Sequence, residues 1–505
     1  MTAPAIDVLI VGGGPVGTAL AIDLTRRGLA VRIIDKADHG FDGSRAKGLQ
    51  PRTLEILDDL GALDDILAGG AQYPLLGIHL GPVTVPWRMV RSPYSGDESV
   101  PFPHTWLIPQ SRTDQALRDR LSRLGANVEY QCELIELSQT PDDVHASINT
   151  PEGVHTITAR YVVGADGGGS TVRKQAGIGF SGSTDEADRM LIVDAAVSGG
   201  LSRDRWHIWP GRSGRFTGAC PLPHGEQFQW MIRLNADEAA PLDAEGITQC
   251  IRAHTRNQRL AVHDITWSSV FRPNVRLAEN YRLARVFLAG DAAHVHTPFG
   301  GQGLNTGVQD AYNLGWKLGQ VIAGAPPELL DTYEAERLPI AAAVLGLSTK
   351  KYDGMAKGDP ATIKRGKDEQ QIALTYRGGP LAPSTAPRTA TLQVGDRTPD
   401  ARVHDSTGKE LRLFDAYRGP QFTALACGPR AAAELDQLNW PAGGAALQRI
   451  TVDADTDTDT EGFRKIYGID SEAMILIRPD GYIGGIATQE MSAIKSTVAA
   501  LTPPA

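Results

Sequence analysis

The sequence predicts a mixed α/β protein with more than one sheet. Three observations lead to this fold class: the chain opens with a strand, a glycine-rich turn and a helix; two later buried strands each run into a turn of Gly and Asp; and the middle region consists of short strands. With 505 residues, 41% of them hydrophobic and 22% charged, the chain has the balance of a globular protein of roughly two to four domains.

The first strand, turn and helix lie in segment 7–36, DVLIVGGGPVGTALAIDLTRRGLAVRIIDK. Pro15 suits the first turn of a helix, and Gly28 stops that helix. Three glycines between strand and helix have the G-x-G-x-x-G spacing, which serves a tight turn, the close approach of a pyrophosphate and helix-on-strand packing. Asp35 ends the next strand, where a carboxylate can accept hydrogen bonds from ribose hydroxyls. The segment therefore predicts dinucleotide binding rather than a purely structural βαβ unit.

Charge and hydropathy exclude several classes of partner. The formal charge of −9 leaves no general basic surface for phosphate backbones or anionic lipid, so we expect neither nucleic acid nor membrane as a partner. The longest apolar runs fall far short of the roughly 20 residues that span a bilayer, and no signal-peptide pattern opens the sequence, so we expect a cytoplasmic protein. The four cysteines stand far apart, which predicts reduced thiols.

Three later segments place glycine and polar residues after strands. Segment 44–61, SRAKGLQPRTLEILDDLG, is an arginine-containing loop and a helix, and segment 161–178, YVVGADGGGSTVRKQAGI, is a buried strand with an Asp-Gly turn. Segment 290–318, GDAAHVHTPFGGQGLNTGVQDAYNLGWKL, combines a Gly-Asp turn, a glycine run and an amphipathic helix. Glycine backbone, which has no side chain, would allow a flat ligand ring to lie close beside it. The positive end of the helix near Leu304 could stabilise negative charge on such a ligand.

Together these motifs resemble the class A FAD-dependent aromatic hydroxylases, most closely the branch of phenol hydroxylases and aromatic polyketide hydroxylases. The resemblance covers roughly residues 1 to 350, plus a weaker C-terminal part. It implies FAD and NAD(P)H as cofactors, with molecular oxygen and a small aromatic substrate as partners. In this family the acid that matches Asp35 binds the adenosine ribose, the Arg that matches Arg45 lies along the cofactor, and the Asp that matches Asp291 binds the ribityl chain.

The residues expected to bind the cofactor run from the first glycine turn to the start of the helix after the glycine run. They are Gly12, Gly14, Pro15, Val16, Gly17, Asp35, Lys36, Arg45, Gln110, Asp166, Gly290, Asp291, Pro298, Gly301, Gln302, Gly303, Leu304 and Asn305. Among them, Gln110 stands before a helix and Asp166 opens the Asp-Gly turn, and both are implied by the resemblance.

The resemblance also implies a three-part architecture: a Rossmann-like FAD-binding domain, a β-sheet substrate domain and a C-terminal thioredoxin-like domain. We assign 1–75, 105–180 and 280–350 to the first, 76–104 and 181–279 to the second, 351–395 to a helical segment and linker, and 396–505 to the third. A lone Cys427 stands where the third domain would need a C-x-x-C pair, so thiol exchange is not expected. Packing or a subunit contact in a possible homodimer is the expected role.

The aromatic residues of the middle region are expected to lie on a sheet face. Phe228, Trp230 and Ile232 alternate onto one face, and Trp206, Trp209 and Phe216 are available nearby. Such residues are more often core than ligand cage. A sheet over a flat cofactor also needs an apolar wall, so some of them are expected to face the substrate.

The implied reaction is hydroxylation of a phenolic or polyketide-type ring through a flavin hydroperoxide. A base that deprotonates the phenol would raise the electron density of the ring, but no residue pair identifies that base. Tyr376 and Arg377, in LTYRGGPLAPS, imperfectly match a family segment near the substrate and are the candidate catalytic residues; the alternative is a tethered loop before the linker. Baeyer–Villiger oxygenation, a flavin reductase, and a flavin-bound sensor or interaction protein without oxygen transfer stay open.

Two clusters invite a metal interpretation, and neither is favoured. His294, His296 and Asp291 offer the two imidazoles and one carboxylate of a non-haem iron site, but iron would leave the glycine motifs unexplained. The acidic loop 453–461 matches the first ligand positions of an EF-hand and lacks both its glycine and its final glutamate. We therefore expect no metal.

Overall fold

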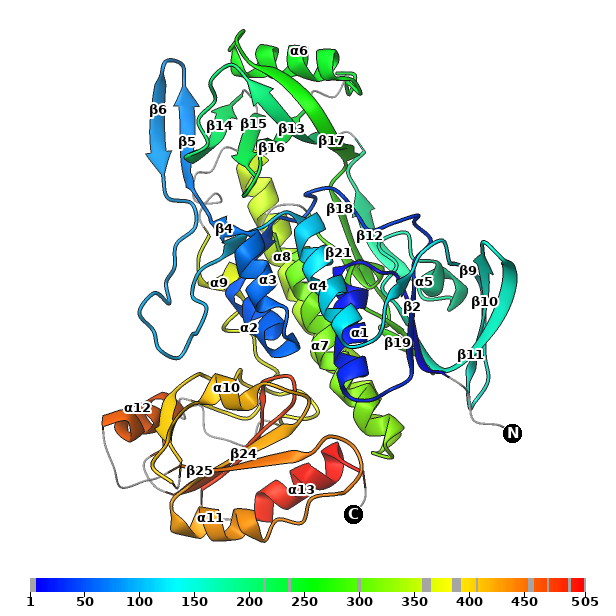
Figure 1. Cartoon of the computed structure of the whole chain (residues 1–505), viewed down its shortest axis with the longest axis vertical. Helices are drawn as coiled ribbons and strands as arrows, with labels where there is room; N and C mark the ends of the chain where they lie inside the picture. The colour runs from blue at the N-terminus through cyan, green and yellow to red at the C-terminus, as the bar shows by residue number, and fades with distance from the viewer. Residues whose placement is uncertain are drawn as a thin grey trace.

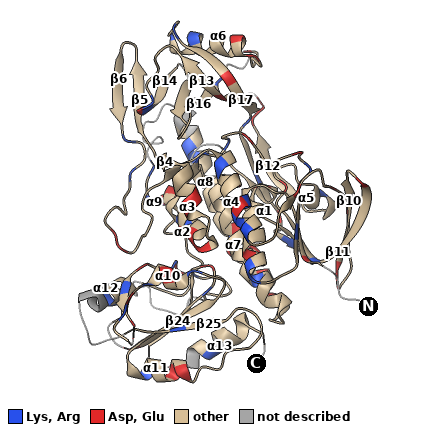
Figure 2. Ribbon diagram, viewed as in Figure 1, with Lys and Arg blue, Asp and Glu red and all other residues tan. Residues whose placement is uncertain are grey.

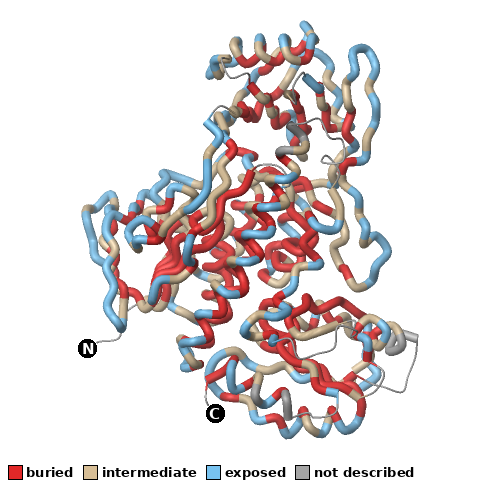
Figure 3. The backbone as a smooth tube through the Cα atoms, turned by 180° about the vertical axis from the view of Figure 1, so that it is seen from behind, coloured by how far each residue is buried: buried red, intermediate tan, exposed pale blue. Residues whose placement is uncertain are grey.

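The protein, seen in a computed structural model, has a central α/β part, a sheet layer at one end and a smaller α/β unit at the other (Figure 1). The structure describes residues 6–186, 188–211, 215–234, 238–297, 301–356, 365–383, 392–405, 407–452, 458–469, 472–488 and 492–503. Figure 3 shows that buried residues gather in the central part and along the strands of the smaller unit.

An eight-stranded sheet forms the middle of the molecule. Its strands, in order, are β19 (Arg282–Leu283), β20 (Val286–Leu288), β11 (Gly153–Gly164), β1 (Ile6–Val11), β2 (Val31–Ile34) and β8 (Val128–Glu129), with β10 (Val144–Thr150) paired to β11 and β9 (Glu133–Gln139) paired to β10. β1 runs parallel to β2 and to β11, and β11 runs parallel to β20. The carboxyl ends of these strands therefore meet at one edge, where ligands bind in open α/β sheets.

The turn from β1 into α1 (Pro15–Arg26) requires glycine at two positions. Gly12 has a φ of 112°, in the left-handed region, and a Cβ there would lie 2.3 Å from the carbonyl oxygen of Ala165. A Cβ at Gly17 would lie 2.0 Å from the carbonyl oxygen of Gly12. Since real Cβ atoms do not approach so closely, the glycines are what allow α1 to start directly against β1.

Helices and two small sheets surround the central sheet. The helices are α2 (Pro51–Leu60), α3 (Leu63–Gly69), α4 (Gln110–Arg123), α5 (Thr171–Gln175), α7 (Gly303–Ile322), α8 (Asp331–Ala356) and α9 (Lys367–Gln370), with short turns η2 (Gly290–Ala292) and η3 (Pro327–Leu330). The small sheets are β3 (Gly48–Leu49), β7 (Trp106–Leu107) and β4 (Ala71–Gln72), and β12 (Phe180–Thr184), β18 (Asn274–Ala278) and β21 (His294–Val295). α1 packs against α4 and α7, and α7 is buried along most of its length.

A seven-stranded sheet forms the layer at one end (Figure 1). Its order is β17 (Ala261–Phe271), β13 (Met190–Ser198), β16 (Gln227–Arg233), β15 (Phe216–Pro221), β14 (Arg205–Pro210), β5 (Leu75–Leu80) and β6 (Val83–Trp87). One face packs on α6 (Ala244–Thr255) through Phe228, Trp230 and Ile232, which confirms their expected role as core. The opposite face carries Ile192 and Phe216 and is turned toward the central part.

The C-terminal unit follows in the order β22 (Arg402–His404), β23 (Glu410–Arg412), α10 (Leu413–Tyr417), β24 (Phe422–Cys427), α11 (Pro429–Asp436), β25 (Leu447–Val452), α12 (Thr458–Tyr467), β26 (Ala473–Ile477), β27 (Ile483–Ala487) and α13 (Ser492–Leu501). Its sheet has the order β25-β24-β26-β27, with β24 parallel to β25 and the other pairs antiparallel. Cys427 ends β24 and is buried, and its pKa is raised by that burial. The acidic loop between β25 and α12 lies mostly outside the described residues.

Buried charges join the C-terminal unit to the two long helices of the central part. Glu336 of α8 accepts from Lys317 of α7 at 2.7 Å and from Arg478, beside the β26–β27 turn, at 2.7 Å. All three side chains are fully buried. Burial alone would raise the pKa of Glu336, but the positive charges of Arg478 and Lys317 lower it to about 2. Asp480 accepts from Arg478 and from the indole N–H of Trp316. Removing one charge of such a set leaves the others buried and uncompensated.

Charge and hydropathy in three dimensions agree with the composition. Lys and Arg are interspersed with Asp and Glu over all three parts (Figure 2). Within the described ranges, no helix combines the length and the apolar character needed to cross a membrane.

Candidate active site

Three adjoining cavities run from the carboxyl end of β1 to the seven-stranded sheet. The strand-end cavity has about 910 Å³ of empty space, the central cavity about 1230 Å³ and the sheet cavity about 1210 Å³, each including space open to solvent. Gly14 and Ala165 line both of the first two. Segment 45–48, Ile192 and Gly301 line both of the last two. The shared residues make the cavities one continuous path.

Most residues of the predicted cofactor set line this path. Gly12, Gly14, Asp35, Lys36 and Asp166 line the strand-end cavity, and Gly14, Pro15, Val16, Arg45, Gln110, Asp291, Gly301, Gln302, Gly303 and Leu304 line the central cavity. Pro298 lies outside the described residues. The motifs that are far apart in the sequence are thus brought to one cleft.

Two of the acids that line the strand-end cavity, Asp35 and Asp166, accept hydrogen bonds from backbone N–H groups. The Asp35 carboxylate accepts from Gly13 at 2.7 Å and from Ala37 at 2.8 Å. The Asp166 carboxylate accepts from the Thr171 N–H at 2.6 Å and from the Ser170 hydroxyl at 2.6 Å, so it fixes the start of α5. Each acid keeps its carboxylate at the cavity wall in a defined orientation.

Two helix N-termini meet at the central cavity. α1 begins at Pro15 after Gly14, and α7 begins at Gly303, as the sequence predicts; neither first turn has a side-chain capping hydrogen bond. The uncapped N–H groups and the positive ends of both helices can bind anionic or electron-rich groups there. The Asp291 carboxylate lies beside the start of α7, where a Cβ at Gly303 would be 3.7 Å from its Oδ1. It also lies 3.9 Å from the Arg45 guanidinium, and both side chains are partly exposed.

Three predicted cofactor residues support the cleft and do not line it. Asn305 is fully buried: its Oδ1 accepts from the Gln50 N–H at 2.8 Å and its Nδ2 donates to the carbonyls of Gly48 at 2.8 Å and Gly301 at 2.6 Å. Asn305 therefore ties the start of α7 to β3. Gly17 permits the packing of α1 described above. A Cβ at Gly290 would lie 2.8 Å from Val16.

The sheet cavity is apolar, with a few cationic and amide groups. Apolar side chains of β5, β13, β14, β15 and β16 form its wall, among them Leu76, Ile78, Met190, Ile192, Trp206, Ile208, Phe216 and Met231. Its charged lining consists of Arg45, Lys47 and Arg365. An enclosed apolar space with a few convergent polar groups is the usual form of a small-molecule site.

Comparison with known proteins decides what the cleft holds. Residues 5–348 match the family model described as FAD binding domain. The chain belongs to this FAD-binding family. A flavin-dependent monooxygenase from Mycobacteroides abscessus is 40% identical over 498 residues, covering 95% of this chain and 96% of that protein. The 6-methylpretetramide 4-monooxygenase of Streptomyces rimosus is 33% identical over 513 residues, covering 94% of this chain and 90% of that protein.

Solved structures agree with this assignment. The anhydrotetracycline hydroxylase from Streptomyces rimosus superposes with a TM-score of 0.78 at 30% identity, covering 99% of this chain and 100% of that chain. Aklavinone-11 hydroxylase, solved with FAD and aklavinone, gives a TM-score of 0.81 at 26% identity, with 99% of each chain covered. The predicted resemblance is confirmed: the chain is an enzyme of the flavin-dependent monooxygenase family, whose named members here include aromatic and polyketide monooxygenases.

The path of cavities fits FAD. At Gly12 and Gly17 a Cβ would collide with backbone, and at Gly14 it would meet no protein atom within 4 Å and would point into free space. A bare turn at a helix N-terminus is what a pyrophosphate needs for close approach. The strand-end cavity offers carboxylates for sugar hydroxyls, and the central cavity joins the sheet cavity, as a flavin that reacts with a bound substrate requires.

A pair of histidines beside the central cavity is hydrogen-bonded within the protein. Nδ1 of His294 lies 2.8 Å from Nε2 of His296, and Nε2 of His294 lies 2.6 Å from the Asp310 carboxylate. Asp310 also accepts from the Arg337 guanidinium at 2.7 Å. Both ring nitrogens of His294 are thus engaged, so the alternative iron site is not formed. His296 lines the central cavity, and its Nδ1 is buried without a hydrogen-bond partner among the described residues.

The predicted catalytic pair, Tyr376 and Arg377, lies outside the linings of the three cavities. Tyr376 is buried among Ile340, Val344 and Tyr482, its hydroxyl accepts from Arg337 at 3.2 Å, and burial raises its pKa. Arg377 forms an ion pair with Asp396. Neither residue lines any of the three cavities. These contacts tether the segment to α8 and to Asp396, which agrees with the alternative named from the sequence, a tethered loop.

Sequence reasoning missed the polar residues of the sheet cavity. Lys47 and Gln229 are buried and hydrogen-bonded to each other, and Gln229 also donates to the Ser44 hydroxyl at 2.6 Å. Arg365 lies on the same cavity, just after described residues resume at 365. Lys47 stands two residues from Arg45 in the predicted loop, which was the one available signal. Gln229 and Arg365 have no motif.

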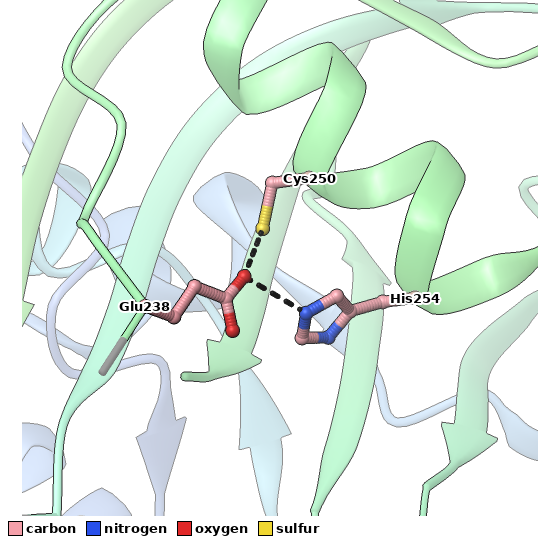
Figure 4. Close-up of side chains that lie close together, drawn as sticks. All are labelled: Glu238, Cys250 and His254. Carbon is pink, nitrogen blue, oxygen red and sulfur yellow. Dashed lines mark hydrogen bonds and ion pairs between the residues drawn. The ribbon is translucent and has the colours of Figure 1, made fainter. Parts of the chain in front are cut away.

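Glu238, Cys250 and His254 form a cluster away from the cleft, on the α6 side of the seven-stranded sheet (Figure 4). The Glu238 Oε1 accepts from the Cys250 thiol at 3.4 Å and from His254 Nε2 at 3.1 Å. Among the described residues, this is the set of His, Cys, Asp or Glu whose ligand atoms lie close enough for one metal ion. Burial and the charge of Glu238 raise the pKa of Cys250 to about 12, which favours the hydrogen-bonded thiol over a thiolate ligand.

Proposed function

We propose that the protein hydroxylates a phenolic or polyketide-type aromatic compound, using FAD, NAD(P)H and molecular oxygen. When bound, FAD would supply the redox chemistry, in which the nicotinamide provides the electrons and one atom of molecular oxygen passes to the ring. The observation that carries the proposal is that the central cavity and the sheet cavity share Ile192 and Gly301 in their linings. A flavin ring in the first cavity could therefore reach a substrate in the second. The names of the relatives, which include polyketide and chlorophenol monooxygenases, support it.

The protein's own groups then have distinct tasks. We propose that Asp35 binds the adenosine ribose, that Asp291 accepts hydrogen bonds from the ribityl hydroxyls, and that Gly14 and the α1 N-terminus receive the pyrophosphate. The α7 N-terminus at Gly303 stabilises negative charge on the reduced ring. The apolar wall of the sheet cavity excludes water from the reacting oxygen.

The division into domains supports this function. We propose a Rossmann-like FAD domain, a substrate domain formed by 76–104 and 181–279, and a thioredoxin-like domain from about 396 onward. The seven-stranded sheet takes β5 and β6 from the first substrate segment and its other strands from the second. The β-α-β-α-β-β-α order from β24 to α13 supports the thioredoxin-like assignment.

The proposed function is tested with the purified, FAD-loaded enzyme. NADPH and NADH oxidation, oxygen uptake and product mass are followed with a panel of phenols and polycyclic hydroxyaromatics. A substrate should accelerate NAD(P)H oxidation and gain one oxygen atom. NMR of the product separates a new ring hydroxyl from the ester of a Baeyer–Villiger reaction. Reductant oxidation without oxygen uptake would indicate a reductase, and no stimulation by any compound would favour a flavin-bound sensor.

A further inference from the structure

The sheet cavity contains an imbalance of charge that the protein does not neutralise. Three cationic residues line it, Arg45, Lys47 and Arg365, and no carboxylate is among its lining residues in the described part of the chain. Arg45 is largely exposed and lies toward Asp291, so its charge is partly balanced and solvated. The two basic groups without a balancing carboxylate in the cavity lining are Lys47 and Arg365.

Lys47 is a buried amine without an ionic partner. The residue is 9% exposed, its amine lies over the Trp206 ring at 4.5 Å, and it bonds to the neutral Gln229 amide. The carboxylate whose charge acts to raise the pKa of Lys47 is that of Asp194. This carboxylate accepts hydrogen bonds from the N–H and the hydroxyl of Ser44. No carboxylate within the described residues lies at ion-pair distance from Lys47. An ammonium group in such a place is costly unless it is paired.

The surroundings of Lys47 favour the neutral amine in the empty cavity. Burial lowers the pKa of Lys47, and the charges of Cys220 and Asp194 oppose this without cancelling it. Burial also raises the pKa of Cys220 to about 11, so this neighbour is a thiol at neutral pH. The other groups around the amine are Gln229, Met231 and the aromatic ring beside it. A neutral amine in an apolar cavity can accept a proton from an acidic ligand.

Arg365 provides the second half of the arrangement. Arg365 lines the cavity, and the Nη1 atom of its guanidinium is buried without a hydrogen-bond partner among the described residues. The charge of the Glu369 carboxylate acts to raise the pKa of Arg365, but this carboxylate forms an ion pair with Lys351. Arg365 and Lys47 line the same cavity as Tyr73, whose hydroxyl donates to the Lys47 backbone carbonyl and whose pKa the charge of Arg365 acts to lower. A guanidinium cannot accept a proton, and an unsatisfied N–H in an apolar wall requires an acceptor from the ligand.

We propose that the sheet cavity binds an acidic phenol or enol as its anion, with Lys47 taking the hydroxyl proton and Arg365 donating to the charged oxygen. The proposal rests on the proposed function and specifies its substrate class. The O–H bond of the ligand breaks, a new N–H bond forms on the Lys47 amine, and the electron pair stays on the ligand oxygen. The cavity then holds an ammonium and a guanidinium around one oxyanion. The resulting phenolate has the raised ring electron density that oxygen transfer requires.

The test measures the ionisation of a bound probe in the oxidised holoenzyme, without reductant. The probe is 2-hydroxyanthraquinone, whose neutral and anionic forms differ in visible absorption, and 2-methoxyanthraquinone is the matched ligand that cannot ionise. Difference spectra against the holoenzyme are recorded across pH. The bound hydroxyl should titrate about 1 to 3 pH units below the free probe, and near neutral pH the hydroxy compound should bind at least tenfold more tightly than its methyl ether.

Two variants assign the effect to the named residues. Lys47→Met and Arg365→Gln should each move the bound transition upward by about one unit or more, with affinity for the methyl ether changed by less than about threefold. Ile208→Val, an uncharged change in the same wall, should leave the transition in place. FAD content and the visible flavin spectrum show whether each variant keeps its fold. If a variant does not fold, the titration of the wild-type protein still tests whether the probe binds as its anion.

Three results would overturn the proposal: a bound probe that stays neutral until the pH at which the free probe ionises, a transition that neither variant moves, or no binding of the probe up to its solubility limit. The outcome is separate from that of the proposed function. If the enzyme hydroxylates a phenol but binds the probe as a neutral molecule, only the proposal of anion binding is refuted. Anion binding without any oxygenation would refute the function alone.

Discussion

The cofactor cleft and the sheet cavity are built from different parts of the polypeptide. The cleft is formed mainly by backbone: glycine turns, two helix N-termini and carboxylates held by N–H groups. The sheet cavity is formed by side chains that project from five strands. Apart from a change to proline, a substitution leaves the backbone N–H in place, whereas it replaces the side chain outright. The difference predicts that FAD binding in the cleft is lost when a substitution adds atoms beside the backbone. Substrate binding in the sheet cavity should instead change whenever a lining side chain is replaced.

The largest effect is expected at Gly12. Gly12→Ala places a Cβ 2.3 Å from the Ala165 carbonyl oxygen at a φ of 112°. It should destabilise the fold by roughly 2–5 kcal/mol and abolish FAD binding. The control is Gly346→Ala in α8, where a Cβ meets nothing within 4 Å. Thermal unfolding and flavin absorbance of the purified proteins measure both, and a yellow Gly12→Ala protein with unchanged Tm would contradict the steric argument.

The second effect comes from a side chain in the cleft and depends on pH. Burial, with the neighbouring His294, lowers the pKa of His296 to about 3. The folded state keeps His296 neutral while the unfolded chain protonates it below about pH 6.5, so stability falls as the pH drops below 6.5. About 2–3 kcal/mol should be lost by pH 4.5.

Urea unfolding between pH 7.5 and 4.5 measures this loss. His296→Asn should show a flatter profile than wild type. Part of the slope should persist because burial lowers the pKa of His79 to about 4 and acts in the same direction. Parallel profiles for wild type and variant would show that His296 does not remain neutral in the fold.

Asp291 is expected to give the third effect. Asp291→Ala removes the acceptor proposed for the ribityl hydroxyls and should weaken FAD binding about 10- to 100-fold. Asp291→Asn keeps one acceptor oxygen and should lie between the Ala variant and wild type. Equilibrium titration of apoprotein with FAD measures the Kd, and unchanged affinity in the Ala variant would remove Asp291 from the cofactor contacts.

The smallest effect on binding, and the most specific effect on chemistry, is expected at the boundary between the two regions. Ile192→Ala opens the wall shared by the central and sheet cavities and should leave FAD affinity within about threefold of wild type. It should admit water and raise the fraction of NADPH oxidised without product. Val193→Ala removes volume from the opposite face of the same strand and is the control. Equal coupling in the two variants would place the reacting atoms elsewhere.

The same difference explains what the sequence could predict. Glycine spacing and strand ends are local patterns, so the turn at Gly12, the start of α7 and the cleft residues were predicted from sequence. The polar lining of the sheet cavity combines Lys47, Gln229 and Arg365, which come from separate elements, and no spacing relates them. Tyr376 was misplaced because a short tyrosine segment carries no information about which side of α8 it packs on. Asn305 was placed at the right helix end, but its buried hydrogen bonds to the Gly48 and Gly301 carbonyls depend on tertiary contacts.

The buried charge set of Lys317, Glu336 and Arg478 has a consequence for how the molecule melts. A chain truncated before the C-terminal sheet would expose Glu336 and Lys317 together with the apolar flank of α7, and the severed unit would carry Arg478 without the Glu336 carboxylate. Calorimetry of the intact protein should therefore show a single cooperative peak, and neither half should be recoverable as an independent fragment.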